Sequence, residues 1–185
     1  EDIVKFKYKY NLSKSKIIIR INDCDYTRPN LSSSVSREQI LLKYFNYIDL
    51  FIFNSNFIKK YYTEKYFQLK NLNNLVVYNG VNPNIFYPLK GKVLNKRHIT
   101  IVTHHWSTNI NKGYETYFKL WKYLKNIQNI SFKFIGREFN QRYKGVPVFG
   151  PYHGKELASQ LRNCDIYLTD SIYDSCPNHV IEGIM

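Results

Sequence analysis

Two acidic residues near the end of the chain, Asp174 and Glu182, are the first candidates for chemistry. They lie eight positions apart, on either side of Pro177, where a polar loop meets the start of an expected helix. Proline suits that position, because its fixed φ fits the first helical turn and its missing N–H is not needed there. The unpaired N–H groups of such a turn attract anions. A carboxylate would repel a phosphate bound there, so we expect the two acids to bind sugar hydroxyls instead.

The elements that must position the two acids are a strand and a helix. An apolar run at 166–168 predicts a buried parallel strand, and the apolar residues of 180–184 follow at helical spacing. Ser175 lies in the loop between them, and Asn178 and His179 lie in the first turn of the helix. We expect N–H groups of this turn to hold phosphate or sugar oxygens. On the pattern alone, a strand, a loop and a helix with solvated acids explain the stretch equally well.

The pattern Ser171-x-x-Asp174-x-x-Pro177-x-x-x-x-Glu182 resembles the donor-binding signature of the family-4 (group 1) glycosyltransferases, which have the GT-B fold. In that family the first of two spaced acids lies by the donor sugar, and the second holds the ribose hydroxyls of the nucleotide. The resemblance implies these two roles for Asp174 and Glu182. Asp174 stands where the family signature has Glu, so its side chain is one methylene shorter.

A second segment with the same resemblance, residues 79–88, marks an expected domain boundary. It is similar to Asn-Gly-Val-Asp-x-x-x-Phe-x-Pro, which ends the first domain of family-4 enzymes, with Asn82 where the family commonly has Asp. A tight turn, two prolines and a basic stretch also suit a boundary on physical grounds. We expect 1–88 to be the C-terminal part of an acceptor-side Rossmann-like domain, 89–97 a linker, and 98–185 the first part of a nucleotide-sugar-binding one.

Alternating apolar runs and helical patterns predict an α/β fold on both sides of this boundary. Such alternation favours parallel sheets with right-handed crossovers. The resemblance implies the GT-B plan of two Rossmann-like domains, both incomplete here, so we expect a fragment truncated at both ends. Ser55 is expected to cap a helix, and Pro147 indicates an edge strand. The expected strands are 16–22, 49–53, 75–78, 99–102, 132–135, 146–149 and 166–168.

Basic side chains near the acids would have to bind the diphosphate. Lys112 precedes Gly113 just before an expected helix, where a lysine reaches a diphosphate as a mobile point charge. The resemblance implies that Lys112 neutralises the leaving nucleotide diphosphate, and a solvated surface lysine is the alternative. The family often has an arginine a few residues earlier, and this chain has none there. We expect Arg137, after the strand at 132–135, to supply that charge.

Two adjacent histidines occupy the place of the missing arginine. His104 and His105 lie in an expected loop at 103–107. Neighbouring residues of an extended segment point in opposite directions, so the two side chains cannot grip one metal ion from a shared face. We therefore expect no metal site. We expect one of the two histidines to hydrogen-bond a phosphate or a sugar, with Trp106 packed beside it.

Arg20 and Asp23 are the acceptor-side candidates. They lie at the end of the expected strand at 16–22 and in the loop after it. Open α/β sheets bind ligands beyond the carboxyl ends of their strands. A structural ion pair or a loop cap is the alternative for these two residues, and Asp23 with Asp25 alone makes a poor metal site.

The composition favours an anionic partner and a reducing compartment. The chain has 27 Lys and Arg against 14 Asp and Glu, a formal net charge of +13 that suits nucleotides, phospholipid surfaces or nucleic acid. An AT-rich genome would give the same bias without any function. Three widely spaced cysteines favour free thiols over a disulfide framework or a zinc site. No apolar run is long enough to span a bilayer, so we expect a cytoplasmic protein whose charge allows peripheral membrane association.

Together these patterns predict an enzyme, a hexosyltransferase-like glycosyltransferase. The resemblance implies sugar transfer from a nucleotide-sugar donor with retention, without a metal or another cofactor, to a glycan, lipid-linked or protein acceptor. Two other classes stay open: a basic, non-catalytic module that binds nucleic acid or a membrane surface, and another GT-B enzyme such as a nucleotide-sugar epimerase. The sequence has no RNP-like, KH or zinc-finger pattern, so no specific nucleic acid is expected. We expect the fragment alone to lack activity, because its acceptor loops are expected to lie outside it.

Overall fold

The computed structural model describes residues 5, 7, 9–11, 14–27, 37–91 and 97–185. The chain divides into two compact units, Glu1–Asn79 and Gly80–Met185. The expected boundary at 89–97 falls later in the chain, and residues 92–96 of it lie outside the described part. The earlier division has a packing cause, because Val81, Ile85 and Phe86 join the apolar core of the second unit.

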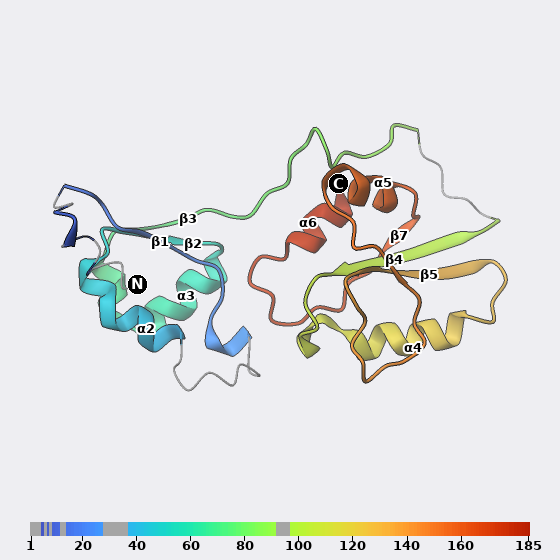
Figure 1. Cartoon of the computed structure of the whole chain (residues 1–185), viewed down its shortest axis with the longest axis horizontal. Coiled ribbons are helices and arrows are strands. Elements are labelled where there is room, and N and C mark those ends of the chain that lie inside the picture. Colours follow the sequence, from blue (N-terminus) through green and yellow to red (C-terminus); the bar gives the residue numbers. More distant parts are fainter. Residues whose placement is uncertain (1–4, 6, 8, 12–13, 28–36, 92–96) are drawn as a thin grey trace. The chain divides into compact units, whose positions relative to one another are not determined.

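The first unit contains a three-stranded parallel sheet with the order β1–β2–β3 (Figure 1). Helices follow the first and second strands, as the alternation of patterns predicted. The elements are β1 (Ile18–Ile21), α2 (Arg37–Tyr44), β2 (Leu50–Phe53), α3 (Asn56–Lys65) and β3 (Asn74–Val76), with 3-10 turns at Asp25–Thr27, Phe45–Tyr47 and Phe67–Asn71.

The central strand β2 anchors the core of the first unit. Phe51 and Phe53 are almost fully buried and belong to one cluster with Ile58 of α3. Apolar residues in succession suit a central parallel strand that is covered on its faces. Ser55 caps α3 as predicted, since its Oγ accepts a hydrogen bond of 3.3 Å from the N–H of Ile58.

The second unit contains a four-stranded parallel sheet with the order β6–β5–β4–β7. Helix α4 lies on one side of this sheet in Figure 1, and α5 and α6 lie on the other. The elements are β4 (Ile99–His105), a 3-10 turn (Ile110–Lys112), α4 (Tyr114–Leu124), β5 (Ile130–Gly136), β6 (Val148–Phe149), α5 (Gly154–Arg162), β7 (Ile166–Tyr167) and α6 (Asn178–Ile184).

Each face of the second sheet has its own apolar core. On one face, Tyr114 and Tyr117 of α4 pack in a cluster with Phe134 of β5. On the other, Leu157 of α5 packs in a cluster with Ile135 of the same strand. Phe134 and Ile135 are successive residues of β5, and successive strand residues point to opposite faces of a sheet. The α/β prediction is therefore met by a sheet with helices on both faces.

Two expectations about strands of the second unit need correction. Residues 103–105, expected in a loop, continue β4, with His104 opposite Ile135 and His105 opposite Gly136 of β5. Gly136 permits this pairing, because a Cβ there would lie 2.2 Å from the carbonyl oxygen of His105. The strand at 166–168, expected to be buried, is an edge strand of the described sheet, and its Ile166 is 41% exposed. β6, at the other edge, follows Pro147 as predicted.

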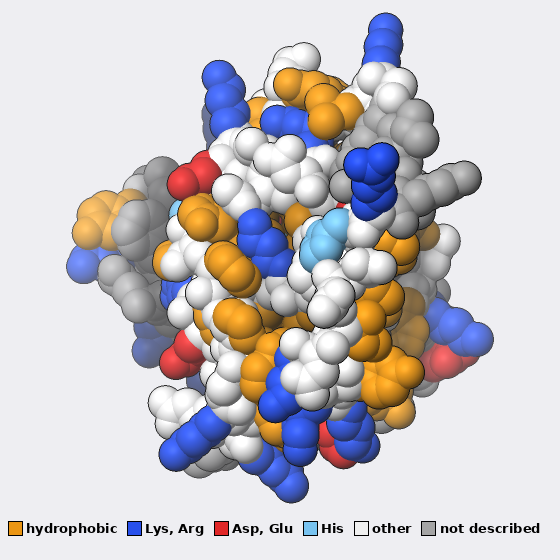
Figure 2. All heavy atoms as spheres, turned by 90° about the vertical axis from the view of Figure 1, so that its right-hand side faces the viewer, with side chains coloured by type: hydrophobic (Ala, Val, Ile, Leu, Met, Phe, Trp, Pro, Cys, Tyr) orange, Lys and Arg blue, Asp and Glu red, His pale blue; other side chains and the backbone are white. Residues whose placement is uncertain are grey.

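The basic charge forms no single patch on the face of the molecule that Figure 2 shows. Figure 2 shows Lys and Arg side chains spread among hydrophobic and neutral polar ones on the face in view. None of the three cysteines forms a disulfide within the described residues. Within the described residues, we find no helix with the length and apolar character of a membrane span.

Candidate functional site

The candidate site lies where the carboxyl ends of β4 and β7 meet. These strands pair in parallel, with Val102 opposite Tyr167, so the segments that follow them leave the sheet at the same edge. The segment after β4 carries the 3-10 turn that ends at Lys112, and the segment after β7 carries Asp174 and leads into α6. The topology therefore brings together groups that are 62 or more residues apart in sequence.

Lys112 and Asp174 form an ion pair between these two segments. The Lys112 ammonium bonds to Oδ2 of Asp174, and both side chains are about one-fifth exposed, at 21% and 20%. Each is thus partly shielded from water while staying accessible to a ligand. The structure brings together the cation and the first acid that the sequence had singled out.

Three contacts fix the two segments against each other. The N–H of Ile172 donates to the carbonyl oxygen of Asn111 at 2.9 Å, and the N–H of Asp170 donates to the hydroxyl of Tyr117 at 2.8 Å. Gly113 has a φ of +78°, and a Cβ there would lie 2.7 Å from the Cβ and the carbonyl oxygen of Asp170. Only glycine combines that conformation with such a close approach at low cost.

Glu182, the second acid, is held by His104. Nε2 of His104 lies 2.8 Å from Oε2 of Glu182, with the histidine side chain 1% and the glutamate side chain 21% exposed. A carboxylate only accepts hydrogen bonds, so Nε2 carries the proton in this contact. Nδ1 of His104 is buried and has no hydrogen-bond partner among the described residues. The histidine therefore orients the carboxylate of Glu182 from inside the sheet.

His179 lies beside Asp174 and beside His104, the histidine that holds Glu182. Its Nδ1 lies 3.8 Å from Oδ2 of Asp174, and its Nε2 lies 3.2 Å from the hydroxyl of Thr169 and 3.1 Å from that of Ser171. Its ring also lies edge-on to His104, with centroids 6.1 Å apart. Burial, together with the charge of Lys112, lowers the pKa of His179 to about 4. The ring is therefore uncharged near neutral pH.

His105 faces the opposite side of the sheet from His104. Its ring stacks on Tyr117 of α4 with centroids 5.5 Å apart, and its Nε2 lies 3.1 Å from the Tyr117 hydroxyl. Burial, followed by the charges of His179 and Lys112, lowers the pKa of His105 to about 2. The ring of His105 also lies edge-on to that of His179, with centroids 4.5 Å apart, so both histidines of β4 contact His179, and His105 is 2% exposed.

The remaining candidates of the second unit lie around the same edge. Arg137 is exposed and follows β5 directly. Ser175 is half-buried in the loop, and Asn178 is the exposed first residue of α6. Trp106, expected beside the histidines, stacks on His153, with ring centroids 4.5 Å apart and planes 6° from parallel. Among the described residues, no group of three or more His, Cys, Asp or Glu side chains is arranged to hold a metal ion.

Arg20 and Asp23 lie in the first unit. The guanidinium of Arg20 donates to the side-chain oxygens of Asn22 at 2.9 Å and of Asn79 at 2.5 Å, and to the carbonyl of Val77 at 3.2 Å. Asp23 is half-buried. Arg20 is thus held at the carboxyl end of β1 by neutral oxygens, where the sequence had placed an acceptor-side group.

Tyr117 is the site residue that sequence reasoning missed. Its helical spacing indicated only that it faces a core, which is correct, since its side chain is fully buried. Its hydroxyl meets both the N–H of Asp170 and Nε2 of His105. No local sequence pattern predicts such a contact, because its partners, Asp170 and His105, come from two other segments of the chain.

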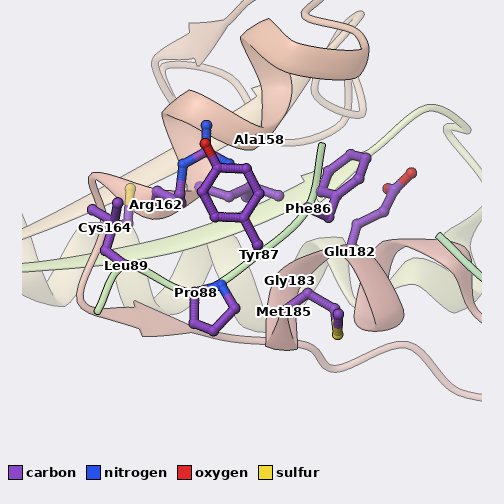
Figure 3. A pocket seen from close by; sticks show the side chains of 11 residues that line it. Phe86, Tyr87, Pro88, Leu89, Ala158, Arg162, Cys164, Glu182, Gly183 and Met185 are labelled. Atoms are coloured by element: carbon purple, nitrogen blue, oxygen red, sulfur yellow. The ribbon is translucent and has the colours of Figure 1, made fainter. Parts of the chain in front are cut away.

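A pocket of about 170 Å³ adjoins Glu182 (Figure 3). The segment from Phe86 to Leu89 lines it together with residues of α5 and α6. Arg162 lies over the ring of Tyr87, its guanidinium carbon 4.4 Å from the ring centre. In Figure 3 the carboxylate of Glu182 points away from Tyr87. The pocket therefore contacts the stem of Glu182, while its carboxylate is turned to His104.

Comparison with known proteins places the fold. No protein-family model matches the sequence, and no curated protein sequence matches it. Among solved structures, sucrose-phosphate synthase from Thermosynechococcus elongatus is similar, with a TM-score of 0.64 at 15% sequence identity, over 95% of this chain and 50% of that chain. The chain thus spans half the length of that structure. At this identity the likeness concerns the fold, and it confirms the expected α/β class with Rossmann-like parallel sheets of the GT-B type.

Proposed function

We propose that this protein is a glycosyltransferase that moves a sugar from a nucleotide-sugar donor to an acceptor. One observation carries the proposal: Lys112 pairs with Asp174 at the same strand edge where His104 holds Glu182. A cation beside two carboxylates suits a ligand that has both a diphosphate and hydroxyl groups. The similarity in fold to a structure named sucrose-phosphate synthase supports the same class.

In this proposal the second unit binds the donor. Lys112 neutralises the charge that develops on the leaving diphosphate, with Arg137 and the N–H groups near Ser175 and Asn178 as further donors. Asp174 accepts hydrogen bonds from the transferred sugar, and Glu182 accepts them from the ribose. These roles need neither a metal nor another cofactor. Retention of the anomeric configuration belongs to the proposal as well.

Three neighbouring histidines act by positioning these groups. His104 orients Glu182, and His179 fills the space between His104 and Asp174 as a neutral ring. His105 braces the sheet against α4 through Tyr117. A neutral, buried histidine supports a site without adding charge that would compete with Lys112.

The acceptor side of the proposal rests on the first unit. Arg20 and Asp23 are its candidate groups, and a glycan, a lipid-linked sugar or a protein is the acceptor. We propose a cytoplasmic enzyme, with a net charge of +13 that favours contact with anionic membrane surfaces. The same positive charge would attract a substrate that carries an anionic group.

A panel of UDP-, GDP- and ADP-sugars tests the donor site by thermal shift. A donor that binds only the folded state raises the melting temperature by mass action. We expect one nucleotide series to do so, and we expect Lys112→Met and Glu182→Gln to abolish the shift. Lys119→Met, which removes a lysine from an exposed pair with Glu115, is the control that should keep it. A panel in which no donor stabilises the protein contradicts the proposal.

The net charge of +13 favours a second candidate function, non-catalytic binding of nucleic acid or membranes. Phosphate-driven binding falls steeply as salt rises. The dispersed charge in Figure 2 predicts weak polynucleotide binding that disappears near physiological salt. Tight binding at that salt would favour this second function. A product analysis that finds an isomerised donor and no transferred sugar would instead favour an epimerase.

A further inference from the structure

We propose that the ion pair between Lys112 and Asp174 makes the site select sugar-bearing nucleoside diphosphates over the free nucleoside diphosphate. The inference rests on the proposed function, because it concerns the same donor site. The two side chains bond to each other, and each is only about one-fifth exposed, at 21% and 20%. A ligand that binds one member of the pair separates it from the other member, which then needs a new partner.

The cation and the carboxylate differ in what can replace them. When Lys112 turns from Asp174 to a phosphate oxygen, it exchanges one charged acceptor for another. The free-energy cost for the lysine is therefore small. Asp174 loses its ammonium partner at the same moment and faces the phosphate charge. Leaving a partly buried charge without a partner costs more than the pair itself contributes. Hydroxyl groups of a bound sugar supply donors to the carboxylate oxygens. The free nucleoside diphosphate has no such sugar, and its ribose hydroxyls are assigned to Glu182.

His179 is not placed to take over from Lys112 as a partner of Asp174. Nδ1 of His179 lies 3.8 Å from Oδ2, beyond hydrogen-bond distance. Its ring is buried, and its Nε2 lies near the hydroxyls of Thr169 and Ser171. The segment before Asp174 is tied to Asn111 through the N–H of Ile172. The loop therefore keeps the carboxylate near Lys112, and in this inference the hydroxyls of the ligand replace the lysine.

The same exchange acts on the product. Once the sugar has left, the hydroxyl donors have left with it, and Asp174 competes with the nucleoside diphosphate for Lys112. Re-formation of the pair then favours release of the diphosphate. The pair thereby reduces inhibition by the product while it keeps the affinity for the intact donor.

Calorimetric titration compares each nucleoside diphosphate with its sugar: UDP with UDP-glucose, GDP with GDP-mannose and ADP with ADP-glucose. In the unmodified protein the sugar nucleotide of the recognised series should bind about tenfold more tightly than its diphosphate. Asp174→Asn keeps the side-chain shape and removes the charge. It should tighten diphosphate binding about tenfold and leave the sugar nucleotide unchanged or weaker, so that the preference disappears.

A matched control separates this exchange from a general change in charge. Glu115→Gln removes one carboxylate from a pair with Lys119 on α4 in the same unit, where the two side chains are 61% and 72% exposed. It should leave both affinities within about twofold. Lys112→Met should weaken both ligands and leave the sugar nucleotide the tighter of the two, because the carboxylate of Asp174 still lacks a donor beside the free diphosphate. Equal binding of the two ligands in this variant would contradict the inference even if Asp174→Asn does not fold.

The outcomes distinguish the inference from the function on which it rests. Equal binding of diphosphate and sugar nucleotide, with Asp174→Asn changing both alike, overturns the selection and leaves the donor site standing. A protein that binds neither class of probe overturns both proposals. A preference that is lost in Asp174→Asn and kept in Glu115→Gln supports the inference.

Discussion

Gly113 shows how a single residue places the Lys112 side chain. Its φ of +78° lies in the left-handed region, and a Cβ would meet the Cβ and the carbonyl oxygen of Asp170 at 2.7 Å. Two separate costs would follow from any larger residue, one from the backbone conformation and one from the clash.

Gly113→Ala should therefore lower the free energy of unfolding of the second unit by about 2–4 kcal/mol. Gly154→Ala is the matched control, since its φ is +50° and nothing lies within 4 Å of an added Cβ. It should cost only about 1 kcal/mol, the conformational part alone. Urea denaturation measures both. Equal losses for the two variants would mean that the approach to Asp170 is not tight in solution.

The buried histidines predict a loss of stability in mild acid. The pKa of His179 is lowered to about 4 by burial, and that of His105 to about 2. An unfolded chain protonates these rings below about pH 6.5, while the folded protein does not, so acid favours unfolding. Stability is fully present above pH 6.5 and falls as the pH drops toward the lower, folded values.

We expect each of the two rings to contribute a slope of about 1.4 kcal/mol per pH unit between pH 6 and pH 5. Urea denaturation at pH 7, 6 and 5 measures the combined slope. His179→Gln should reduce it by about half, because Gln does not titrate. His153→Gln, at an exposed position, is the control that should leave the slope unchanged. An unchanged slope in His179→Gln would show that this ring is accessible to protons in the folded state.

At the scale of single residues, the sequence singled out Lys112, Asp174 and Glu182 through their types, their spacing and a family resemblance, and their roles stay predictions. It did not reveal the partner of each group. His104 as the partner of Glu182 is 78 residues away in the chain, and the Tyr117 hydroxyl serves a backbone N–H 53 residues later. Contacts of this kind are set by strand order and register, which no local pattern encodes.

At the scale of elements, Glu38 ties α2 to α3. Its carboxylate is 1% exposed and accepts hydrogen bonds from Lys65 at 2.6 Å and from the hydroxyls of Tyr66 at 2.6 Å and Tyr61 at 3.0 Å. The N–H of Asp25 donates to it as well, at 2.8 Å. Burial raises the pKa of Glu38, but these hydrogen bonds together outweigh burial and leave the pKa below its ordinary value.

Glu38→Gln should lower the free energy of unfolding of the first unit by about 2 kcal/mol, because a neutral amide replaces a buried carboxylate that accepts hydrogen bonds from Lys65, Tyr61 and Tyr66. Glu64→Gln on α3 is the control, since its pair with Lys60 has a 3.9 Å separation and both side chains are mostly exposed. It should change stability by less than about 0.5 kcal/mol. The difference between the two variants should be largest above pH 4.5 and shrink as acid protonates Glu38 through its lowered pKa. A difference that does not shrink at all as the pH falls below 4.5 would contradict this origin.

Strand identity was more predictable than strand length. Every described strand overlaps an apolar run that had indicated one, because the run reflects burial on a sheet. The end of β4 was missed, since Thr103, His104 and His105 are polar and look like a loop in sequence. They are buried because β5 continues beside them with apolar residues, so the neighbouring strand decided the outcome.

At the scale of the whole chain, the two units have separate apolar cores. The first core gathers around β2, and the cores of the second unit cover the two faces of its sheet. The first residues after Gly80 join the second unit because their apolar side chains find a core there, although the prolines and basic residues that signal a boundary come later. Composition marks where a chain is exposed, and packing determines where a unit begins.

Hydrogen exchange read by mass spectrometry should therefore report two independent stabilities. Glu38→Gln should raise exchange in peptides from β1 and β2 and leave β4 and β5 unchanged, and Gly113→Ala should do the reverse. A bound sugar nucleotide should protect only peptides of the second unit. If either variant raises exchange equally in both units, the two cores unfold as one.

The stacked rings of Trp106 and His153 provide a tryptophan fluorescence signal from the end of β4. The chain has only two tryptophans, and Trp121 packs on α4 near Phe118, so Trp121→Phe would leave one indole, beside the site. An exposed imidazole stacked on that indole influences its emission, and a ligand that shifts the imidazole changes the emission in turn. Fluorescence of the unlabelled protein can then follow each arrival and departure of a ligand in real time.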